Sequence, residues 1–343
     1  MNYPDVTILV AARNEEDNVV DLLKSIEKLN YPKDKLQVLV GNDASTDATE
    51  EIITAFISGK PYFNLINVDE ALLAQQPENI RSLKGKARVL AIMSHHATGD
   101  FYFYTDADVE LPVTWVETML SHFELPDNTG TDTKPVGVVV GITIVKATSV
   151  FTACQALEWI MAISEMKLFS VMKIATTGMG NNMAVRKEAY WENGGYETIG
   201  FSIVEDYALY RAVIDSGYPF VQTFVPGVLA HTKPPKKYFE QRKRWFRGGM
   251  ESRSFLIVPI MMQALALPAV VILGFFNLWL PLYIFLGVLV INLCTGTFVL
   301  RKLRQTFLIP YLPVYTVYMF VFWFFQLVYY ILPTKLVWKG RTY

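Results

Sequence analysis

The strongest constraint on the fold comes from three long segments near the C-terminus that contain no charged residue. They cover residues 255–275, 278–300 and 308–332, and each is longer than the about 20 residues that span the apolar core of a bilayer. Residues 255–343 contain no acidic residue, a composition that does not suit an ordinary water-exposed surface. We therefore expect a membrane region over residues 255–343.

A buried helical bundle is the alternative to a membrane region. A helix of such a bundle carries a polar face, and these segments have almost none. They also contain or adjoin aromatic residues of the kind that favours membrane–water interfaces: Trp279, Trp323, Tyr329 and Tyr330. The membrane interpretation is therefore favoured.

The basic residues around the apolar segments leave the number of membrane crossings open. One basic cluster, over 233–253, precedes the first segment. The other two are Arg301, Lys302 and Arg304 between the second and third segments, and Lys335, Lys339 and Arg341 after the third. Basic loops favour the cytosol, yet three full crossings place the last cluster outside. One segment is therefore expected to be re-entrant or interfacial, with candidate breaks at Pro259, Pro268, Pro310 and Pro313.

The N-terminal part alternates patterns of buried strands with patterns of helices. Strand patterns cover 6–12, 36–40, 63–68, 101–105 and 136–145, and helical spacing covers 16–29 and 84–97. This alternation predicts an α/β fold with a mostly parallel sheet and helices on both faces. We divide the chain into a domain over 1–232, a basic amphipathic interface segment over 233–254, and the membrane region over 255–343.

Charge and cysteine content exclude several classes of protein. The formal net charge is −1, so no overall field favours nucleic acid, and we expect no nucleic-acid partner. Cys154 and Cys294 lie far apart and support neither a disulfide framework nor a zinc site. The start of the sequence lacks the features of a signal peptide, because a strand pattern begins directly after the first five residues. We therefore expect the N-terminal domain to stay in the cytosol.

Acidic residues follow two predicted strands, at the end where parallel sheets bind ligands. Asp43 can accept hydrogen bonds from a uracil N–H or from ribose hydroxyls, although the surrounding residues also suit a turn or a helix cap. Asp106 and Asp108 point the same way if their segment is extended. Two adjacent carboxylates favour a cation between them, and Mg²⁺ or Mn²⁺ binds such oxygens together with phosphates. A polar turn is the alternative.

Two further motifs also have two interpretations. Glu205 and Asp206 open a helix predicted over 205–216, where acids either favour the helix dipole or provide a general base for a hydroxyl. Gln241, Arg244 and Trp245 lie in the basic stretch before the first apolar segment. That stretch suits anionic lipid, whereas Arg244 can neutralise a diphosphate and Trp245 can wall an acceptor site.

In this order, the four motifs resemble the family 2 glycosyltransferases of the GT-A fold. The closest resemblance is to the membrane branch with ceramide glucosyltransferases, cellulose synthases and hyaluronan synthases. That branch shows Asp, Asp-x-Asp, Glu-Asp and Gln-x-x-Arg-Trp motifs before its membrane helices. The resemblance extends from residue 6 to about residue 253, and loosely over the C-terminal region, including 338–341. It implies a GT-A-type Rossmann-like mixed sheet with helices on both faces, and an all-α transmembrane region.

The resemblance also implies roles for further residues. Arg13, Asn14 and Glu15 match the family's first nucleotide-contacting loop, and Lys84 and Lys86 match its donor-phosphate segment. The glycine-containing stretch 177–182 matches the loop that shapes the acceptor side, since glycine permits close backbone approach. His231 lies where some relatives carry a metal ligand, and a structural histidine is the alternative.

The reaction that the resemblance implies is transfer of a sugar, with inversion, from a nucleotide-sugar, most often a UDP-sugar. In it Asp43 holds the nucleoside, and Asp106 and Asp108 hold Mg²⁺ or Mn²⁺ on the donor diphosphate. Asp206 takes the proton of the acceptor hydroxyl. Gln241, Arg244 and Trp245 complete the site around diphosphate and acceptor.

Departures from the family pattern narrow the expected function. Asn42 precedes Asp43 where many relatives carry a second acid, and no membrane helix precedes the first domain. Three apolar segments are also fewer than a polymer-export channel uses. We therefore expect one sugar per acceptor on a multi-pass membrane protein with a cytosolic catalytic domain. The acceptor is a lipid or a glycan, and the membrane attachment favours a lipid. A polysaccharide synthase and an inactive scaffold are the alternatives, whereas a dinucleotide-dependent oxidoreductase is excluded because no Gly-x-Gly-x-x-Gly follows the first strand.

Overall fold

The computed structural model describes residues 3–124, 134–200, 202–251, 254–332, 337–338 and 341–342. The chain forms two compact units, one of Met1–Thr143 with Thr177–Thr232 and one of Ile144–Thr176 with Lys233–Tyr343. The end of the first unit coincides with the predicted boundary at residue 232. Residues Ile144–Thr176, which the sequence placed in the first domain, cluster with the second unit. Arg253, Lys335 and Lys339, which entered the topology prediction, lie outside the described residues.

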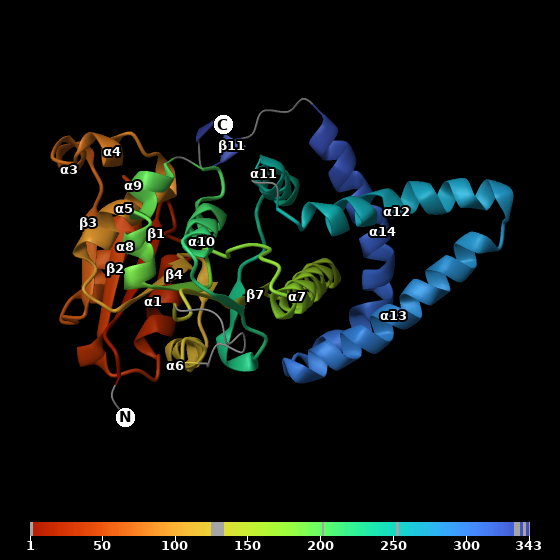
Figure 1. The fold of residues 1–343 in the computed structure, drawn as a ribbon, viewed down its shortest axis with the longest axis horizontal. Helices are drawn as coiled ribbons and strands as arrows, with labels where there is room; N and C mark the ends of the chain where they lie inside the picture. Colours follow the sequence, from red (N-terminus) through yellow and green to blue (C-terminus); the bar gives the residue numbers. More distant parts are fainter. Residues whose placement is uncertain are drawn as a thin grey trace. The chain divides into compact units, whose positions relative to one another are not determined.

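The first unit contains a seven-stranded sheet of order β3-β2-β1-β4-β8-β6-β9. The four strands at one side, β3, β2, β1 and β4, are parallel, and β8 runs antiparallel to its neighbours β4 and β6. The bounds are β1 Val6–Ala12, β2 Leu36–Asn42, β3 Phe63–Asn67, β4 Phe101–Asp106, β6 Val138–Val140, β8 Met183–Arg186 and β9 Phe220–Gln222. The predicted α/β architecture is confirmed (Figure 1).

Nine helices of the first unit's described residues surround the strands. Their bounds are α1 Val19–Glu27, α2 Thr49–Ile57, α3 Glu70–Ala74, α4 Glu78–Arg81, α5 Gly85–His96, α6 Trp115–Ser121, α8 Lys187–Glu192, α9 Gly195–Ile199 and α10 Glu205–Asp215, with 3-10 turns η1 Lys33–Lys35 and η2 Pro226–Val228. α1 buries Val19, Leu22, Leu23 and Ile26, the spacing of an amphipathic helix. It begins later than predicted. The Glu16 amide donates to the Asp47 carboxylate of the neighbouring loop, and the first helical hydrogen bond runs from the Val19 amide to the Glu15 carbonyl.

The predicted strand at 136–145 is interrupted by Gly141. It divides into β6, which stays in the main sheet, and β7 Ile142–Val145. β7 belongs to a separate three-stranded sheet of order β5-β10-β7, with β5 Val109–Glu110 and β10 Leu229–Thr232. The buried Asn182 side chain explains the break. It accepts a hydrogen bond from the Trp115 indole at 2.8 Å and donates to the carbonyls of Ile142 and Val228, both at 2.8 Å.

We expect Gly141→Ala to destabilise the first unit. A Cβ at position 141 would lie 1.9 Å from Oδ1 of Asn182, which is fully buried and has no room to move. Overpacking combined with a broken buried hydrogen-bond hub costs about 2–3 kcal/mol. Thermal or urea unfolding measures the loss. Gly59→Ala is the control, because nothing lies within 4 Å of its Cβ and only its positive φ opposes the change. Equal stability of the two variants would contradict the prediction.

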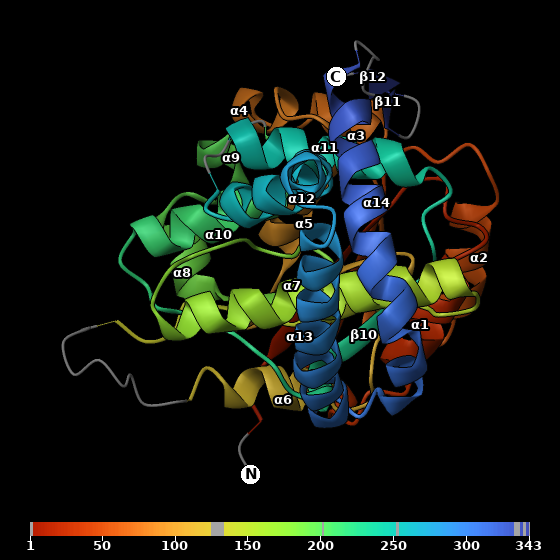
Figure 2. The ribbon, with the colours of Figure 1, turned by 90° about the vertical axis from the view of Figure 1, so that its right-hand side faces the viewer.

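The second unit is helical. Its elements are α7 Val150–Val171, α11 Tyr238–Glu251, α12 Ile257–Phe276, α13 Leu280–Lys302, η3 Thr306–Tyr311 and α14 Leu312–Ile331, followed by a hairpin of β11 Val337–Trp338 and β12 Arg341–Thr342. α7 packs across α13 and α14 (Figure 2). A hydrogen bond from Asn292 to Thr316 at 3.1 Å joins α13 to α14.

Three of these helical stretches are long and apolar enough to cross a membrane: Ile257–Phe276, Leu280–Lys302 and Thr306–Ile331. Many of their apolar side chains are exposed in the chain by itself, for example Phe275 at 87% and Phe276 at 84%. α12 continues through Pro268 as one helix, so the break considered there is not observed. In the third segment Pro310 lies within η3, and Pro313 occupies the first turn of α14, where proline is tolerated.

Candidate active site

Three neighbouring parallel strands end at the same edge of the sheet and carry charged residues there. In the register, Ala12 of β1 lies beside Asn42 of β2, and Ala11 lies beside Asp106 of β4. Arg13 and Asp43 follow directly, so the residues predicted from separate strand ends are brought together. This edge is where α/β sheets bind ligands.

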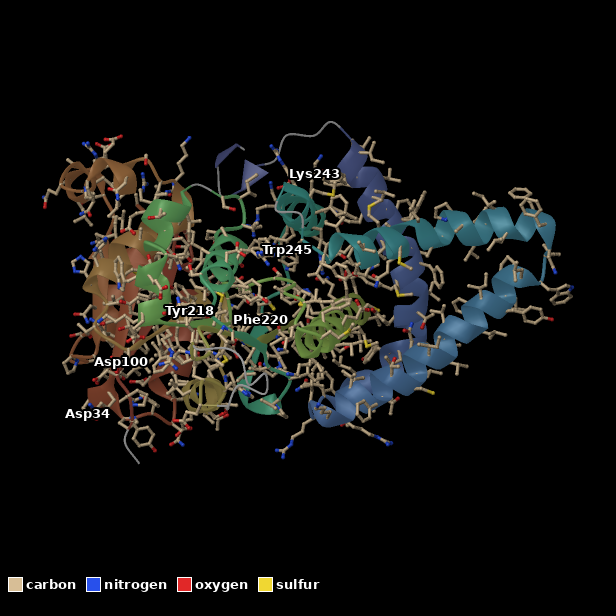
Figure 3. The ribbon with its side chains drawn as sticks, viewed as in Figure 1. Asp34, Asp100, Tyr218, Phe220, Lys243 and Trp245 are labelled. Atoms are coloured by element: carbon tan, nitrogen blue, oxygen red, sulfur yellow. The ribbon has the colours of Figure 1, made fainter. Side chains whose placement is uncertain are left out.

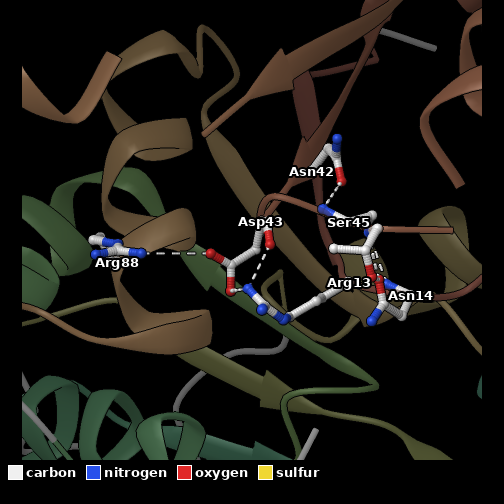
Figure 4. A network of polar contacts seen from close by, with 7 residues as sticks. Arg13, Asn14, Asn42, Asp43, Ser45 and Arg88 are labelled. Carbon is white, nitrogen blue, oxygen red and sulfur yellow. Dashed lines mark hydrogen bonds and ion pairs between the residues drawn. The ribbon is translucent and has the colours of Figure 1, made fainter. Parts of the chain in front are cut away.

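Asp43 lies between two guanidinium groups (Figure 4). Its carboxylate is 3.6 Å from Nη1 of Arg13 and 3.5 Å from Arg88, and only 7% of the side chain is exposed. Arg13 also donates to the backbone carbonyl of Asp43 at 2.7 Å. The sequence interpretation did not single out Arg88. It lies on α5 two residues after Lys86, and nothing local distinguishes it from an ordinary surface arginine.

The loops after β1 and β2 interlock beside Asp43 (Figure 4). The Asn14 side chain accepts a hydrogen bond from the Thr46 amide at 2.8 Å, and the Asn14 amide donates to the Ser45 hydroxyl at 3.1 Å. Asn14 and Ala44 both have left-handed backbones, with φ of 52° and 49°. Alanine adopts this conformation only at a cost, so surrounding contacts fix both loops in place.

Glu15 belongs to the same loop and is buried. Its amide donates to the Thr49 hydroxyl at 2.7 Å, and its carboxylate accepts from the Asn18 side chain at 2.7 Å. Of the predicted nucleotide-contacting residues, Asn14 and Glu15 thus shape the loop, whereas Arg13 faces Asp43. The loop is therefore organised before any donor arrives.

Lys86 connects two of the predicted motifs. Its ammonium lies 2.5 Å from the carboxylate of Asp106 and 3.4 Å from that of Glu205. Burial lowers the pKa of Lys86, but Asp106, Glu205 and Asp206 raise it further and leave it above its ordinary value. Lys86 therefore remains a cation among three acids. Lys84, two residues earlier, is exposed at the start of α5.

Asp106 and Asp108 have different partners. Residues 107 and 108 form a turn between β4 and β5, so the alternation of an extended segment does not apply to this pair. Asp106 meets Lys86, and the Asp108 carboxylate accepts a hydrogen bond from the Thr232 hydroxyl on β10 at 3.2 Å. His231, the neighbour of Thr232, pairs with Glu110 across the small sheet.

The side chains of the turn that contains Asp106 and Asp108 suit a hard divalent cation. Both side chains offer carboxylate oxygens, the ligands that Mg²⁺ and Mn²⁺ prefer. In the described part of the chain, no group of three or more His, Cys, Asp or Glu side chains is placed to hold a metal by itself. A two-carboxylate site leaves the other ligand positions to phosphates and water.

Asp206 and the glycine-containing loop 177–182 come together. Oδ2 of Asp206 accepts a hydrogen bond from the Gly180 amide at 2.7 Å, and Oδ1 accepts from the Tyr207 amide at 2.8 Å. A Cβ on Gly180 would lie 2.8 Å from the Asp206 side chain, so this approach requires glycine. Glu205 meets Lys86, and the two adjacent acids therefore have separate environments.

Gln241, Arg244 and Trp245 lie on α11 of the second unit. The Trp245 ring is 5.2 Å from that of Trp159 on α7, with an interplanar angle of 73°. Lys243 and Trp245 mark this helix in Figure 3. The sequence motif did not predict the contact between Trp245 and Trp159, nor a role for the neighbouring Arg242.

Two family models and several curated proteins match this chain. A model described as glycosyl transferase family 2 matches residues 7–194, and one described as glycosyl transferase family group 2 matches residues 103–339. The probable glycosyltransferase YdaM of Bacillus subtilis (strain 168) is 28% identical over 256 residues, which cover 71% of this chain and 55% of the relative. The 4,4'-diaponeurosporenoate glycosyltransferase of Staphylococcus aureus (strain bovine RF122 / ET3-1) is 25% identical over 233 residues, which cover 64% of this chain and 56% of the relative. The chain thus spans about half the length of these curated relatives.

A solved structure shares the fold. The mannosyltransferase PcManGT from Pyrobaculum calidifontis, in complex with GDP-Man and Mn²⁺, superimposes with a TM-score of 0.55 at 19% identity, over 94% of this chain and 88% of that chain. This likeness confirms the predicted GT-A-like sheet with apolar helices at the C-terminus. Because the family model accounts for 7–194 of 343 residues, the chain belongs to glycosyl transferase family 2.

Proposed function

We propose that this chain transfers a sugar, with inversion, from a nucleotide-sugar to a lipid acceptor at the cytosolic face of a membrane. The observation that carries the proposal is the cluster of Asp43, Lys86 and Asp106 with two arginines at the carboxyl ends of β2, β1 and β4. Acidic and basic groups in one place suit a donor that combines a nucleoside with a diphosphate. The three apolar helices of the same chain supply a reason for a lipid acceptor.

On the donor side, we assign the nucleoside to Asp43. Its carboxylate can accept hydrogen bonds from a uracil N–H or from ribose hydroxyls, and Arg13 and Arg88 hold it in orientation. The cationic Lys86 suits the donor diphosphate, as does the exposed Lys84 at the start of α5. The family resemblance favours UDP as the nucleotide.

Asp106 and Asp108 are the residues that would hold Mg²⁺ or Mn²⁺. When bound, such an ion neutralises diphosphate charge. Lys86 already provides one fixed positive charge beside Asp106. The metal-binding part of the donor site therefore joins the two acids Asp106 and Asp108 with the cationic Lys86.

On the acceptor side, we assign the general base to Asp206. Its carboxylate takes the proton of the acceptor hydroxyl as that oxygen bonds to the anomeric carbon, and the bond to the diphosphate breaks. The Gly180 amide fixes the carboxylate in orientation. The sequence motif assigns Arg244 to the leaving diphosphate, with Gln241 and Trp245 beside the acceptor.

The experiment is a panel of labelled nucleotide-sugars. Membranes that contain the chain are incubated with UDP-glucose, UDP-galactose, UDP-N-acetylglucosamine or GDP-mannose, and lipid is then extracted. We expect one labelled lipid that is absent from membranes carrying Asp206→Asn. A polymer ladder would support a polysaccharide synthase, and a donor that is never consumed would support an inactive scaffold.

We also expect the chain to stay in the membrane under harsh washing. The exposed apolar side chains of α12 and α13 lose favourable burial if they leave lipid. Extraction with alkaline carbonate and with high salt should leave the full chain in the pellet, and detergent should release it. Recovery of a monomeric full-length chain in detergent-free buffer would refute this expectation.

A further inference from the structure

A buried ion pair joins α7 to α11 in the second unit. Oε2 of Glu158 lies 2.6 Å from Nη2 of Arg242, and the side chains are 6% and 12% exposed. Burying two charges costs more than an apolar pair of similar size. The pair lies outside the charged cluster of the first unit and had no place in the sequence interpretation. Since burial of two charges is a poor way to gain stability, the other contacts of the pair bear on its role.

Two tyrosine hydroxyls complete the surroundings of Glu158. Tyr318 of α14 donates to Oε2 at 3.1 Å, and the hydroxyl of Tyr238 lies 2.6 Å from that of Tyr318. Burial raises the pKa of Glu158, while Arg242 and the tyrosine hydroxyls oppose that shift. Burial and the Glu158 charge raise the pKa of Tyr238 to about 12, so it stays a neutral donor. Oε2 of Glu158 therefore meets both Arg242 and Tyr318, and it holds the Arg242 guanidinium in place.

Arg242 in turn lies among three aromatic rings. Its guanidinium carbon is 4.9 Å from the ring centre of Trp245, 5.2 Å from that of Tyr238 and 5.9 Å from that of Trp159. Its Nε is buried and makes no hydrogen bond within the part of the chain that the structure describes. The guanidinium therefore binds Glu158 at one end and uses its faces to hold aromatic rings.

The spacing on α11 places the residues of this arrangement on one face of the helix. Tyr238, Arg242 and Trp245 are four and three residues apart and share one face. The opposite face has its own anchor: Lys243 donates to the Leu332 carbonyl at 2.8 Å and lies 5.5 Å from the Tyr329 ring. Figure 3 labels Lys243 and Trp245 on this helix. Lys243 is therefore a matched control for the loss of one buried cation from α11.

We propose that Arg242, held by Glu158, is a positioning residue that fixes the ring of Trp245 for the acceptor. The inference rests on the proposed function, in which Trp245 lies beside the acceptor. It deepens that proposal by naming the residue that fixes the orientation of the Trp245 ring. Neither Glu158 nor Arg242 touches substrate in this role. Arg242→Lys keeps a charge for Glu158 but removes the flat guanidinium that faces the ring.

The alternative role for the ion pair is to hold the fold alone. Breaking one partner leaves a buried charge, whereas replacing both by apolar residues restores stability. If the pair only holds the fold, the variant Glu158→Leu/Arg242→Met should regain thermal stability, the position of the Trp245 ring and sugar transfer together. The positioning role predicts recovery of thermal stability only.

The first measurement needs no substrate. The full chain, labelled with 5-fluorotryptophan in detergent micelles, gives one ¹⁹F resonance for each of its seven tryptophans, and Trp245→Phe identifies that of Trp245. We expect Arg242→Lys, Glu158→Gln and the double variant each to shift or broaden this resonance. Lys243→Met should leave it in place. An unchanged Trp245 resonance in Arg242→Lys and in the double variant would overturn the inference. If a single variant fails to fold, the resonance of the double variant still decides the question.

The second measurement follows transfer of the labelled sugar that the panel identifies to a total lipid extract in detergent micelles. We expect Arg242→Lys to raise the apparent KM for the lipid about tenfold, with the KM for the donor unchanged. Wild-type transfer by the double variant would overturn the inference. If the wild-type chain transfers no sugar, the proposed function fails, and the Trp245 resonance still decides the positioning role.

Discussion

Asp206→Asn should lower sugar transfer by at least about 100-fold, the range in which a general base contributes. Asparagine keeps the shape of the side chain and can still accept the hydrogen bond from the Gly180 amide, so the variant should fold. Donor binding should stay nearly intact because its assigned contacts are Asp43, Lys86 and Asp106. Initial rates with labelled donor measure the first effect, and calorimetric titration with the nucleoside diphosphate measures the second.

Glu205→Gln is the matched control for that result. Glu205 precedes Asp206 on α10, but its carboxylate faces Lys86 at 3.4 Å. We expect a milder loss that acts through Lys86 on the donor side. Near-normal transfer by Asp206→Asn with a dead Glu205→Gln would identify Glu205 as the base. Activity of both variants would remove the base assignment from this pair.

Chelation of divalent metal should abolish transfer, and added Mn²⁺ or Mg²⁺ should restore it. The same loss should follow from Asp108→Ala, which removes one of two carboxylates at the turn after β4. Because this turn is near the surface of the sheet edge, the variant should keep its fold. Transfer in EDTA and Mn²⁺ binding in the presence of nucleoside diphosphate, followed by electron paramagnetic resonance, are the measurements.

Thr232→Val tests whether the loss belongs to the metal or to the turn. It removes the hydrogen bond that the Asp108 carboxylate accepts at 3.2 Å and leaves both acids in the chain. We expect this variant to retain Mn²⁺ binding that Asp108→Ala lacks. Full activity in EDTA, or equal Mn²⁺ binding by Asp108→Ala and the wild-type chain, would rule out the metal assignment.

The sequence predicted the long strands and the apolar helices because each carries its own pattern. β1, β2 and β4 are nearly continuous buried runs. The only charged residues in α12 to α14 are Arg301 and Lys302, at the end of α13. The short strands β8 and β9 were missed, since three or four residues gain their order from pairing with neighbours rather than from a local pattern. The break at Gly141 depends on Asn182, about forty residues later, and has no local signal.

The part of the candidate site at the carboxyl ends of the parallel strands was predictable from the sequence. Arg13 and Asp43 follow β1 and β2, and Asp106 ends β4. These strands are parallel neighbours in the sheet, so the sheet alone brings the three residues together. Arg88 and the pair of Glu158 with Arg242 were not predictable in this way. Glu158 and Arg242 are 84 residues apart, and only the packing of α7 on the helices of its unit makes them neighbours.

The path of the chain between the two units decides how a soluble catalytic fragment has to be cut. The first unit is discontinuous: the chain leaves it after Thr143 and returns at Thr177. A truncation that simply stops at residue 232 would keep α7 while discarding Arg242 and Tyr318, leaving Glu158 a buried acid without its counterion and an apolar helix without cover. A well-behaved fragment therefore requires an internal deletion as well, with a short flexible linker in place of residues 144–176.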